Sequence, residues 1–425
     1  MADTIFAVSS GAPPAAIGII RISGPAAGSV LRSLSAADFK PRKAYLTTLR
    51  DGQGAALDQA LILWFPGPHT ATGEDLAELH CHGGRAVLAA VIEVLSAMDG
   101  LRAADSGEFT RRAFQNGRID LSEAEGLGDL LSAETELQRA SAIEMAGGAF
   151  SRKVEAWRTE GLRLSAQIEA VLDFSDEGDV PDIPDTFRIG AETLLAELRG
   201  WLERPRAEKL GEGFRVVLAG PPNSGKSTLF NALVDSEAAI TSPIAGTTRD
   251  VIERSVAIEG TPFSFVDTAG LRESGADQVE AIGIDRAKGQ FEKADLILWL
   301  GPEGEGPAGC HEIAPRKDAP DFVAKALPAL DLSATTGDGV EELKQLLVSE
   351  ARAALPKPGE AALNRRQHAL LAEASEALRA ALGQSDLLLV GEELRCVRLA
   401  FDRLIGRSTT EDMLDTLFGR FCIGK

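Results

Sequence analysis

The chain has 425 residues, a length that predicts about three domains at roughly 150 residues each. Hydrophobic residues make up 44% and charged residues 25%, which is ordinary globular usage and excludes collagen-like, mucin-like and wholly disordered chains. The formal net charge of −20 excludes a broad basic face, so any contact with nucleic acid is local or relies on a partner.

Cysteine usage and hydropathy set the expected compartment. The four cysteines Cys81, Cys310, Cys396 and Cys422 lie far apart, which predicts neither a disulfide framework nor a four-cysteine zinc site. No stretch approaches the ~18 uninterrupted apolar residues of a membrane span, and the first residues lack the pattern of an export signal. We therefore expect a cytoplasmic protein that does not contact the membrane.

The residue pattern divides the chain into four segments. Residues 1–118 mix β-like runs such as Ile17–Ile22 and Leu61–Phe65 with turn clusters, which predicts an α/β or α+β domain. From 119 to 212, apolar residues such as Val154, Trp157, Leu164 and Ile168 recur at helical spacing, with a polar loop at Asp173–Asp182. Residues 213–355 alternate strand-like and helix-like runs, the rhythm of a parallel βαβ sheet, and 356–425 are helical again. The expected fold is multidomain α/β plus all-α, with the α/β unit inserted between two halves of one helical bundle.

The strongest motif is G-x-x-x-x-G-K-S at Gly220–Ser227, placed between a strand at Val216–Ala219 and a helix that starts near Lys226. Its glycines let backbone N–H groups surround phosphates, Lys226 reaches the β and γ oxygens, and the Ser227 hydroxyl binds Mg²⁺. The predicted nucleotide contacts in this loop are Asn223, Ser224, Gly225, Lys226, Ser227 and Thr228.

Two further elements follow in order. A run at Gly246–Asp250 offers a threonine pair, and Asp267–Gly270 follows a strand at Phe263–Val266. Together with the glycine-rich loop they resemble the P-loop, switch I and switch II of a translation-factor-type GTPase. The resemblance adds a second Mg²⁺ ligand and five phosphate or switch contacts: Thr247, Thr248, Asp267, Thr268, Ala269 and Gly270.

Two positions depart from ordinary GTPases. Leu271 is apolar where Ras-like proteins carry the glutamine that orients the attacking water. The guanine-reading N-K-x-D is expected on the strand before Ser333–Gly337, but the segment there, Ala324–Leu327, has no aspartate. Arg316–Asp318 is rejected as a substitute because its lysine and aspartate are adjacent.

A degenerate base pocket is therefore predicted, kept by stacking on Lys325 and by backbone contacts of Ser333 and Ala334. Loss of the charged hydrogen-bond pair to guanine puts base affinity and selectivity in question.

Signatures at both ends of the chain extend the resemblance. The chain finishes Phe-Cys-Ile-Gly-Lys, and the N-terminal region contains Leu63–Pro68, Thr72–Asp75, His82–Gly84, Gly107–Phe114 and Asp120–Glu125 in that order. With the GTPase motifs, these runs resemble the MnmE/TrmE family of tRNA-modification GTPases essentially from end to end.

The resemblance implies a functional system as well as a fold. It implies an N-terminal folate-binding and dimerisation domain, a helical domain in two segments, and a Ras-like P-loop GTPase domain inserted between them. It further implies a homodimer that binds 5-formyl- or methylene-tetrahydrofolate and joins an FAD-dependent GidA/MnmG partner in a heterotetramer. Together such proteins modify the wobble uridine of certain tRNAs at C5, in a carboxymethylaminomethyl-type reaction.

The family's folate pocket corresponds to Arg21, Glu78, Arg118 and Lys425. From the residues alone, Arg21 lies on the same face of the strand as Ile17 and Ile19. A buried cation there needs an anionic partner such as Glu78 or a folate tail. The alternative is a solvated charge on an edge strand.

Two further N-terminal and C-terminal features have open interpretations. His80 and His82 share a strand face with Glu78, but two histidines do not close a metal site, so a polar pocket wall or solvated face is favoured. Cys422 lies near the transferred folate carbon in the family, or is a small buried thiol near the chain end.

The family's hydrolysis is potassium-stimulated, which assigns K⁺ ligation to Asn223, Ser242, Ile244 and Thr247. A glutamate after switch II takes the water-orienting role, and the spacing places it at Glu280. The predicted activity is therefore K⁺-stimulated GTP hydrolysis coupled to tRNA modification. Two rivals stay open: a regulatory GTPase of RNA or ribosome assembly, and a folate-dependent transferase with a degenerate GTPase domain.

Overall fold

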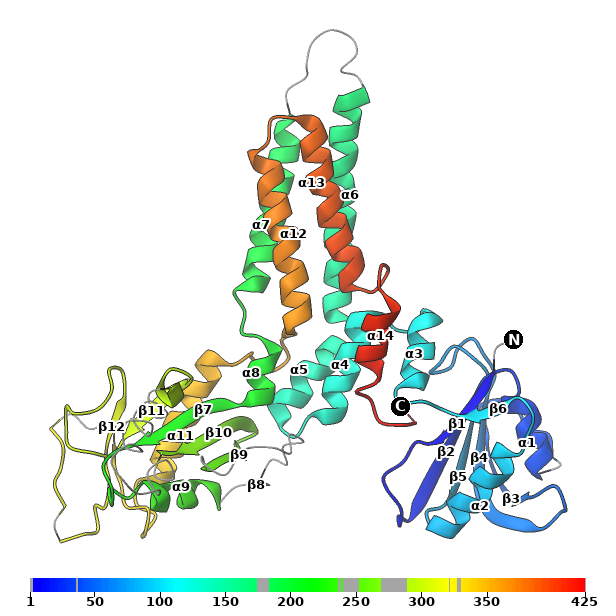
Figure 1. Cartoon of the computed structure of the whole chain (residues 1–425), viewed down its shortest axis with the longest axis horizontal. Coiled ribbons are helices and arrows are strands. Elements are labelled where there is room, and N and C mark those ends of the chain that lie inside the picture. The colour runs from blue at the N-terminus through cyan, green and yellow to red at the C-terminus, as the bar shows by residue number, and fades with distance from the viewer. Residues whose placement is uncertain are drawn as a thin grey trace, which may run out of the picture. The chain divides into compact units, whose positions relative to one another are not determined.

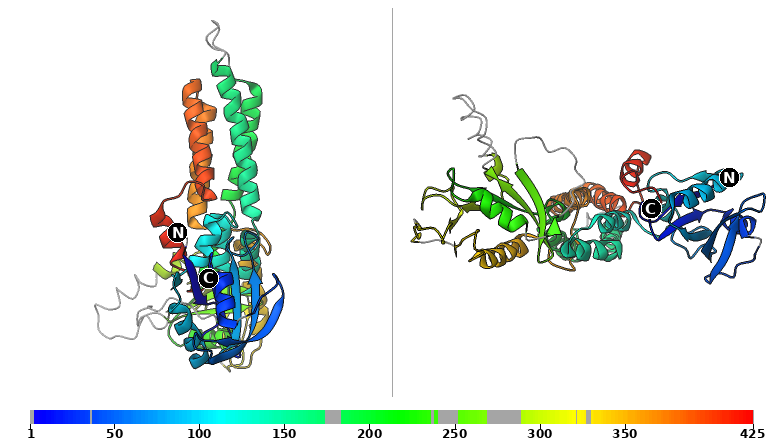
Figure 2. Two further views of the ribbon diagram at one scale, coloured as in Figure 1. Left: turned by 90° about the vertical axis from the view of Figure 1, so that its right-hand side faces the viewer. Right: turned by 90° about the horizontal axis from the view of Figure 1, so that it is seen from below.

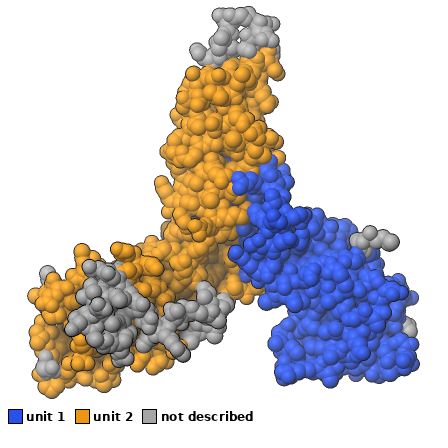
Figure 3. Space-filling view, viewed as in Figure 1, with its two compact units in different colours: residues 1–128, 401–425 blue, residues 129–400 orange. Residues whose placement is uncertain are grey.

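The computed structural model describes residues 3–35, 37–173, 183–235, 238–239, 252–268, 289–320, 322–326 and 330–424. They form two compact units, residues 1–128 with 401–425 and residues 129–400 (Figure 3). The predicted boundary at 118 falls inside the first unit and the one at 355 inside the second. The predicted loop at 173–182 lies outside the described residues except for Asp173.

The first unit is built on a six-stranded sheet in the order β3-β4-β5-β2-β1-β6 (Figure 1). Neighbouring strands are antiparallel except β1 and β6, which are parallel. Both strand-like runs noted in this region are strands. The bounds are β1 (Thr4–Val8), β2 (Ile17–Ser23), β3 (Ala44–Arg50), β4 (Ala56–Phe65), β5 (Leu76–His82) and β6 (Leu101–Ala103).

Two helices, α1 (Ala27–Ser35) and α2 (Arg85–Ser96), cover one face of this sheet. Alternation along each strand explains why: Ile20 and Ile22 point to the helices and are fully buried. The intervening residues of β2 point to the opposite face, where Ile17 is 57% exposed and Leu46 of β3 is 67% exposed. The sheet therefore has one packed face and one partly apolar open face.

The first unit also contains α3 (Glu108–Gln115), the start of α4 (Leu121–Ser132) and α14 (Glu411–Phe418). Leu121, Leu414, Phe418 and Phe421 share one small core. Arg111 of α3 forms ion pairs with Glu411 and Asp415 of α14. The end of the chain thus packs with the N-terminal residues, and the helical segment predicted for 356–425 is divided between the two units.

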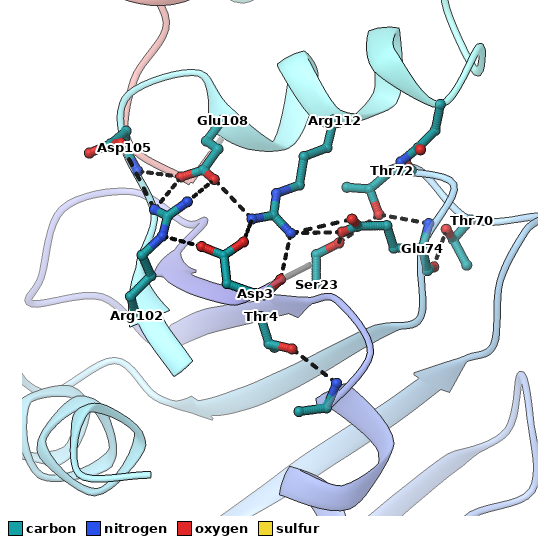
Figure 4. A network of polar contacts seen from close by, with 12 residues as sticks. Asp3, Thr4, Ser23, Thr70, Thr72, Glu74, Arg102, Asp105, Glu108 and Arg112 are labelled. Carbon is teal, nitrogen blue, oxygen red and sulfur yellow. Dashed lines mark hydrogen bonds and ion pairs between the residues drawn. The ribbon is translucent and has the colours of Figure 1, made fainter. Parts of the chain in front are cut away.

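A polar network ties the first strand of this unit to α3 (Figure 4). The side chain of Arg112 is 9% exposed and donates to Asp3 Oδ1 at 2.8 Å, Glu108 Oε1 at 3.0 Å and Glu74 Oε2 at 3.1 Å. Arg102 binds the same Asp3 and Glu108 carboxylates from the other side. Buried charges with this many partners fix the geometry between strand and helix, because any one of them alone would be costly to bury.

Long helices dominate one part of the second unit (Figures 1 and 2). Helix α7 packs against α6 and α12, and the predicted apolar face is confirmed by the burial of Val154, Trp157, Leu164 and Ile168. No helix in the described ranges is both long enough and apolar enough to cross a bilayer. The helices are α5 (Glu136–Ala146), α6 (Ala149–Asp173), α7 (Asp185–Leu202), α8 (Ala207–Glu212), α12 (Arg365–Gly383) and α13 (Leu387–Leu404), whose last turn belongs to the first unit.

The other part of the second unit is a seven-stranded sheet in the order β13-β12-β11-β7-β10-β9-β8. The predicted parallel sheet is right for β7 (Phe214–Ala219), β10 (Thr261–Asp267), β11 (Leu296–Trp299), β12 (His311–Ala314) and β13 (Leu330–Asp331). It is wrong for β8 (Ala238–Ala239) and β9 (Ile252–Ile258), since β9 runs antiparallel to both of its neighbours. The cause is a tight turn at Glu259–Gly260, where both residues have positive φ and the chain reverses into β10.

Helices α9 (Lys226–Val234) and α11 (Val340–Ala354) pack on this sheet and share its core. The beginning of α5 joins the same core, because Leu137 is buried there with Phe214 and Phe263. The Leu137 N–H also donates to Gly260 O at 3.2 Å. The turn between β9 and β10 is therefore the point at which the sheet contacts α5.

We predict that Arg112→Met loosens the first strand. The change leaves Glu74 without its cation, whereas Asp3 and Glu108 keep Arg102, so the cost should stay below the about 3–5 kcal/mol typical of breaking a fully buried ion pair. Amide hydrogen exchange of β1 should accelerate accordingly. Arg139→Met, which removes an exposed pair with Glu136, is the control and should leave β1 exchange unchanged.

The same network predicts a pH dependence. Hydrogen bonds from Arg102 and Arg112 lower the pKa of Asp3, and although burial opposes ionisation of Glu108, bonds from Arg102, the Asp105 N–H and Arg112 lower its pKa as well. A lowered carboxyl pKa contributes stability that is present above the unfolded value of about 4 and is lost as pH falls below it. The protection factors of the β1 amides, which are corrected for the slower intrinsic exchange in acid, should fall on acidification below about pH 4 in the wild type, and less so in Arg112→Met. An equal fall in both proteins would contradict this assignment.

Candidate nucleotide site

The glycine-rich loop Gly220–Ser227 joins the end of β7 to the start of α9, so the predicted strand, loop and helix are confirmed. Gly225 precedes the helix with φ 91° and Asn223 has φ 61°, both in the left-handed region. Such angles turn successive N–H groups toward one side of the loop, and the helix N-terminus adds its positive dipole.

The loop brings a basic and a hydroxyl side chain to the end of β10. Lys226 is 5% exposed and its Nζ donates to Gly220 O at 3.0 Å and Pro221 O at 2.7 Å. The Ser227 hydroxyl donates to Asp267 Oδ2 at 2.7 Å, although the two residues lie on different elements. Thr268 donates to Leu218 O at 2.9 Å, which fixes the chain just after Asp267.

These groups fit a magnesium polyphosphate. Hydroxyl and carboxylate oxygens, as in Ser227 and Asp267, are the ligands that Mg²⁺ prefers, and Lys226 supplies a cation for phosphate oxygens. Ser224 Oγ is buried without a hydrogen-bond partner in the described part of the chain. An anionic ligand in the loop would give that hydroxyl an acceptor.

Several predicted residues lie outside the described residues. These are Ser242, Ile244, Thr247, Thr248, Ala269, Gly270, Glu280 and Lys425. Their roles stay predictions. Thr228, which follows Ser227 on α9, and Ala334, which follows Ser333 after β13, lie at the same edge of the sheet as the loop.

The strand that precedes β13 is not the one expected from the sequence. In a doubly wound sheet the ligand lies at the carboxyl ends of the parallel strands. The strand before β13 is β12, and it runs directly into Pro315–Asp318, whereas the described residues 322–326 contain no strand. Pro-Arg-Lys-Asp has a cation at its second position and an aspartate at its fourth, which is the spacing of N-K-x-D. The adjacency of lysine and aspartate that argues against this run concerns Lys317; counted from Arg316, the cation and the aspartate are two positions apart.

Contacts place this segment beside the phosphate loop. A Cβ built on Gly225 would lie 3.8 Å from Arg316 Cγ and 3.9 Å from Pro315 Cβ. The Lys317 N–H donates to Leu332 O at 3.0 Å, next to the buried Ser333. The Asp318 side chain is exposed at the same edge. The ends of β12 and β13 therefore form one surface next to the loop.

Lys325 does not lie in a base pocket. Its Nζ donates to Glu312 Oε2 at 2.5 Å and to Trp299 O at 3.1 Å, and its side chain is only 7% exposed. The stacking role predicted for this lysine is therefore wrong, because its charge is already paired inside the fold.

The first unit brings together two of the predicted folate residues. Arg21 and Glu78 face each other on β2 and β5, with Nε and Nη2 of Arg21 at 3.1 and 2.9 Å from Glu78 Oε1. Because β2 lies between β5 and β1, the edge-strand alternative for Arg21 is wrong. Arg118 instead donates from Nε to Thr70 O at 3.1 Å.

The two histidines on this face have separate partners. His80 Nε2 lies 3.3 Å from Glu78 Oε2, and His82 Nδ1 lies 2.7 Å from Asp58 Oδ1. Burial, with a smaller effect of Asp58, raises the pKa of the Cys81 thiol between them to about 12. Among the described residues no three His, Cys, Asp or Glu side chains are grouped to hold a metal.

The end of the chain returns to β1. Ser9 Oγ donates to Gly424 O at 2.8 Å, and Ile423 pairs with Ser106. Cys422 is exposed, so the reading of it as a buried thiol is wrong.

Family profiles match nearly the whole chain. The profile described as "GTP-binding protein TrmE N-terminus" matches residues 4–118, and the one described as "MnmE helical domain" matches residues 121–422. Among solved structures, the G domain of the T. maritima FeoB iron transporter is 26% identical, covering 32% of this chain and 98% of that one, with a TM-score of 0.24.

Curated relatives match over full length. A tRNA modification GTPase MnmE of Erythrobacter litoralis is 60% identical over 423 residues, covering 100% of both chains. Proteins of the same name are 60% identical in Novosphingobium aromaticivorans, again covering 100% of both chains, and 48% identical in Zymomonas mobilis, covering 99% of this chain and 100% of that one. On the strength of these matches and of the two family profiles, the chain belongs to the MnmE/TrmE family of tRNA modification GTPases.

Proposed function

We propose that this chain is a GTP hydrolase that acts in tRNA modification, as the names of its relatives state for them. The observation that carries the proposal is the meeting of the Ser227 hydroxyl with the Asp267 carboxylate at 2.7 Å, beside the buried Lys226. A loop, a hydroxyl and a carboxylate from separate segments converge where a phosphate chain and its metal bind.

Each residue at the loop has a distinct task in the proposed reaction. Lys226 exchanges its two backbone acceptors for the β and γ oxygens of the nucleotide. Ser227 and Thr248 are ligands of Mg²⁺, and Asp267 orients the ligands around the ion. Thr268, Ala269 and Gly270 contact the γ-phosphate. Bound Mg²⁺ neutralises charge that develops on the phosphates during transfer.

Potassium and a glutamate complete the proposed chemistry. Asn223, already in a left-handed turn of the loop, holds K⁺ together with Ser242, Ile244 and Thr247. A cation at that place serves as an arginine finger does, by balancing phosphate charge. Glu280 orients the attacking water, a task that the apolar Leu271 cannot perform.

Guanine selection falls to the segment after β12. Asp318 accepts hydrogen bonds from N1 and N2 of the base, Arg316 covers its plane, and the backbone at Ser333 and Ala334 closes the pocket. The support is the placement of this run beside Gly225 and Leu332.

The wider system follows the family. We propose a cytoplasmic homodimer that works with an FAD-dependent MnmG-type partner on the wobble uridine of tRNA, at C5, using a folate one-carbon unit. The Arg21–Glu78 pair with Arg118, Lys425 and Cys422 is the proposed folate region, and the partly apolar open face around Ile17 is available to a second copy. The four segments predicted from sequence, with the GTPase domain inserted in the bundle, remain the proposed domains.

No specific observation favours either of the two rival functions, the folate-dependent transferase or the regulatory GTPase. A transferase with a decayed GTPase domain would not need the Ser227–Asp267 pair or an aspartate at the fourth position after β12. A regulatory GTPase without modification activity has the same site, and full-length similarity to tRNA modification GTPases favours the modifying role.

We predict that Asp318→Asn changes the preferred base. Xanthine has a carbonyl where guanine has its 2-amino group, so an amide at 318 can donate to xanthine whereas a carboxylate accepts from guanine. The ratio of kcat/KM for GTP over XTP should fall by at least about a hundredfold, as expected when a charged hydrogen-bond pair is lost and a new one gained. An unchanged ratio in Asp318→Asn, with a changed one in Lys325→Met, would return the base site to the segment around Lys325.

We also predict that GTP turnover is faster in KCl than in NaCl at equal ionic strength. Asn223→Ala should remove most of this difference, and Asn223→Gly, which adopts the left-handed backbone of this turn without strain, should do the same while retaining Mg²⁺-dependent nucleotide binding. Rates are measured on the purified full chain by phosphate release. A K⁺ effect that survives intact in Asn223→Ala would contradict the assignment of that side chain.

A further inference from the structure

The connection between β11 and β12 has an unusual construction. Neighbouring parallel strands are usually joined by a helix, but residues 300–310 contain none. The segment is rich in glycine and proline, which disfavour regular secondary structure: Gly301, Pro302, Gly304, Gly306, Pro307 and Gly309. Such a chain has high conformational entropy and needs external contacts to take one shape.

Three side chains supply those contacts, and we call Trp299, Glu312 and Lys325 the brace. The Trp299 indole N–H donates to Pro302 O at 2.8 Å, and Glu312 Oε1 accepts the Gly304 N–H at 2.9 Å. Lys325 joins the two by donating to Trp299 O at 3.1 Å and to Glu312 Oε2 at 2.5 Å. The brace thereby fixes both the beginning and the middle of the connection.

The charges of the brace are enclosed. The Lys325 side chain is 7% exposed and that of Glu312 is 16% exposed. Burial opposes ionisation of Glu312, but hydrogen bonds from Lys325 and the Gly304 N–H outweigh it and lower its pKa. Enclosed ion pairs add little net stability compared with apolar side chains of the same size. The main effect of this ion pair is therefore to fix the positions of the groups that it contacts.

The braced segment lies directly against the phosphate-binding loop. A Cβ built on Gly301 would lie 2.8 Å from Pro221 Cδ and 2.5 Å from the Trp299 ring, and one built on Gly220 would lie 3.2 Å from Gly301 N. The Leu300 N–H also donates to Ala219 O at 2.8 Å. On its other side, the same turn offers Gly220 O and Pro221 O to Lys226. Contacts thus run without a gap from Lys325 to Lys226.

We propose that the brace positions the first turn of the phosphate-binding loop, so that Lys325 and Glu312 set nucleotide affinity without touching the nucleotide. They are positioning residues, and Lys325 acts on the phosphate side of the site and not on base selection. The inference rests on the proposed function, since it concerns the same loop.

Two variants and one control test the proposal on the full chain. Lys325→Met leaves Glu312 without its cation. Lys325→Met with Glu312→Leu replaces the pair by apolar side chains, which restores packing but not the hydrogen bonds to Trp299 O and Gly304 N–H. Arg352→Met removes an exposed pair with Glu259 elsewhere on the same sheet domain and serves as control. The readouts are amide exchange at 222–227 without nucleotide, KM and kcat for GTP, and thermal stability.

The double variant is expected to unfold at nearly the wild-type temperature and still to bind GTP poorly. Loss of the hydrogen bonds to Trp299 O and from Gly304 N–H, which hold the connection that lies against the loop, should raise KM about tenfold and accelerate exchange at 222–227 by a similar factor. The GTP to XTP preference should stay at the wild-type ratio, as should every readout in Arg352→Met. A double variant with wild-type KM and exchange would overturn the proposal and leave the pair a packing feature. A shifted base preference would overturn it as well.

Exchange in the absence of nucleotide separates this proposal from the proposed function. If the wild type hydrolyses no GTP, the proposed function fails, but faster loop exchange in the two variants still supports the brace. If the wild type hydrolyses GTP and loop exchange is identical in all four proteins, only the brace fails.

Discussion

The backbone of the phosphate-binding loop is not stabilised by the hydrogen bonds of a strand or a helix. Its N–H groups have to face the ligand, so between β7 and α9 they are not used in a ladder or a helix. Lys226 holds the first turn from within the loop, and further contacts come from outside it. Gly301 and Trp299 lie against one end, Arg316 and Pro315 against Gly225 at the other, and Asp267 binds the hydroxyl of Ser227. The surrounding strands and connections are arranged around this requirement.

Strand β10 connects that site to the helical part of the second unit. One end carries Asp267, bound to Ser227, and the other begins after Gly260, which accepts a hydrogen bond from Leu137 of α5. A strand paired on both sides, with β7 and β9, is stiff along its length. A ligand-dependent shift at Asp267 would therefore be felt at the base of α5. Packed elements of this kind carry energetic coupling between two places in a fold.

Local patterns predicted what depends on local spacing. The glycine-rich loop and the long amphipathic helices follow from neighbours in sequence, since periodicity decides which face is buried. The choice of Glu78 as the partner of Arg21 is made by the pairing of β2 with β5. The strand before β13 depends on strand order: short β12 is visible only in the sheet, and the expected strand around Lys325 is a connection that contains no strand in its described part. The same limit applies to Lys325, whose partner Glu312 and acceptor Trp299 are brought to it by the fold, and to the exposure of Cys422.

The composition of the base segment places more of the discrimination on one side chain. An asparagine at its first position would offer an amide to the nucleotide and the loop, whereas Pro315 has neither a side-chain donor nor a backbone N–H. Arg316 keeps a planar cation beside Gly225. A guanidinium plane can stack on any base, whatever hydrogen-bonding groups that base has at its edge. In the proposed pocket, Asp318 is then the one charged side chain of this run that distinguishes the hydrogen-bonding edge of guanine from those of other purines, beside the backbone at Ser333 and Ala334. A wrong base then leaves an unpaired carboxylate, a penalty that grows as nucleotide binding takes that carboxylate out of water.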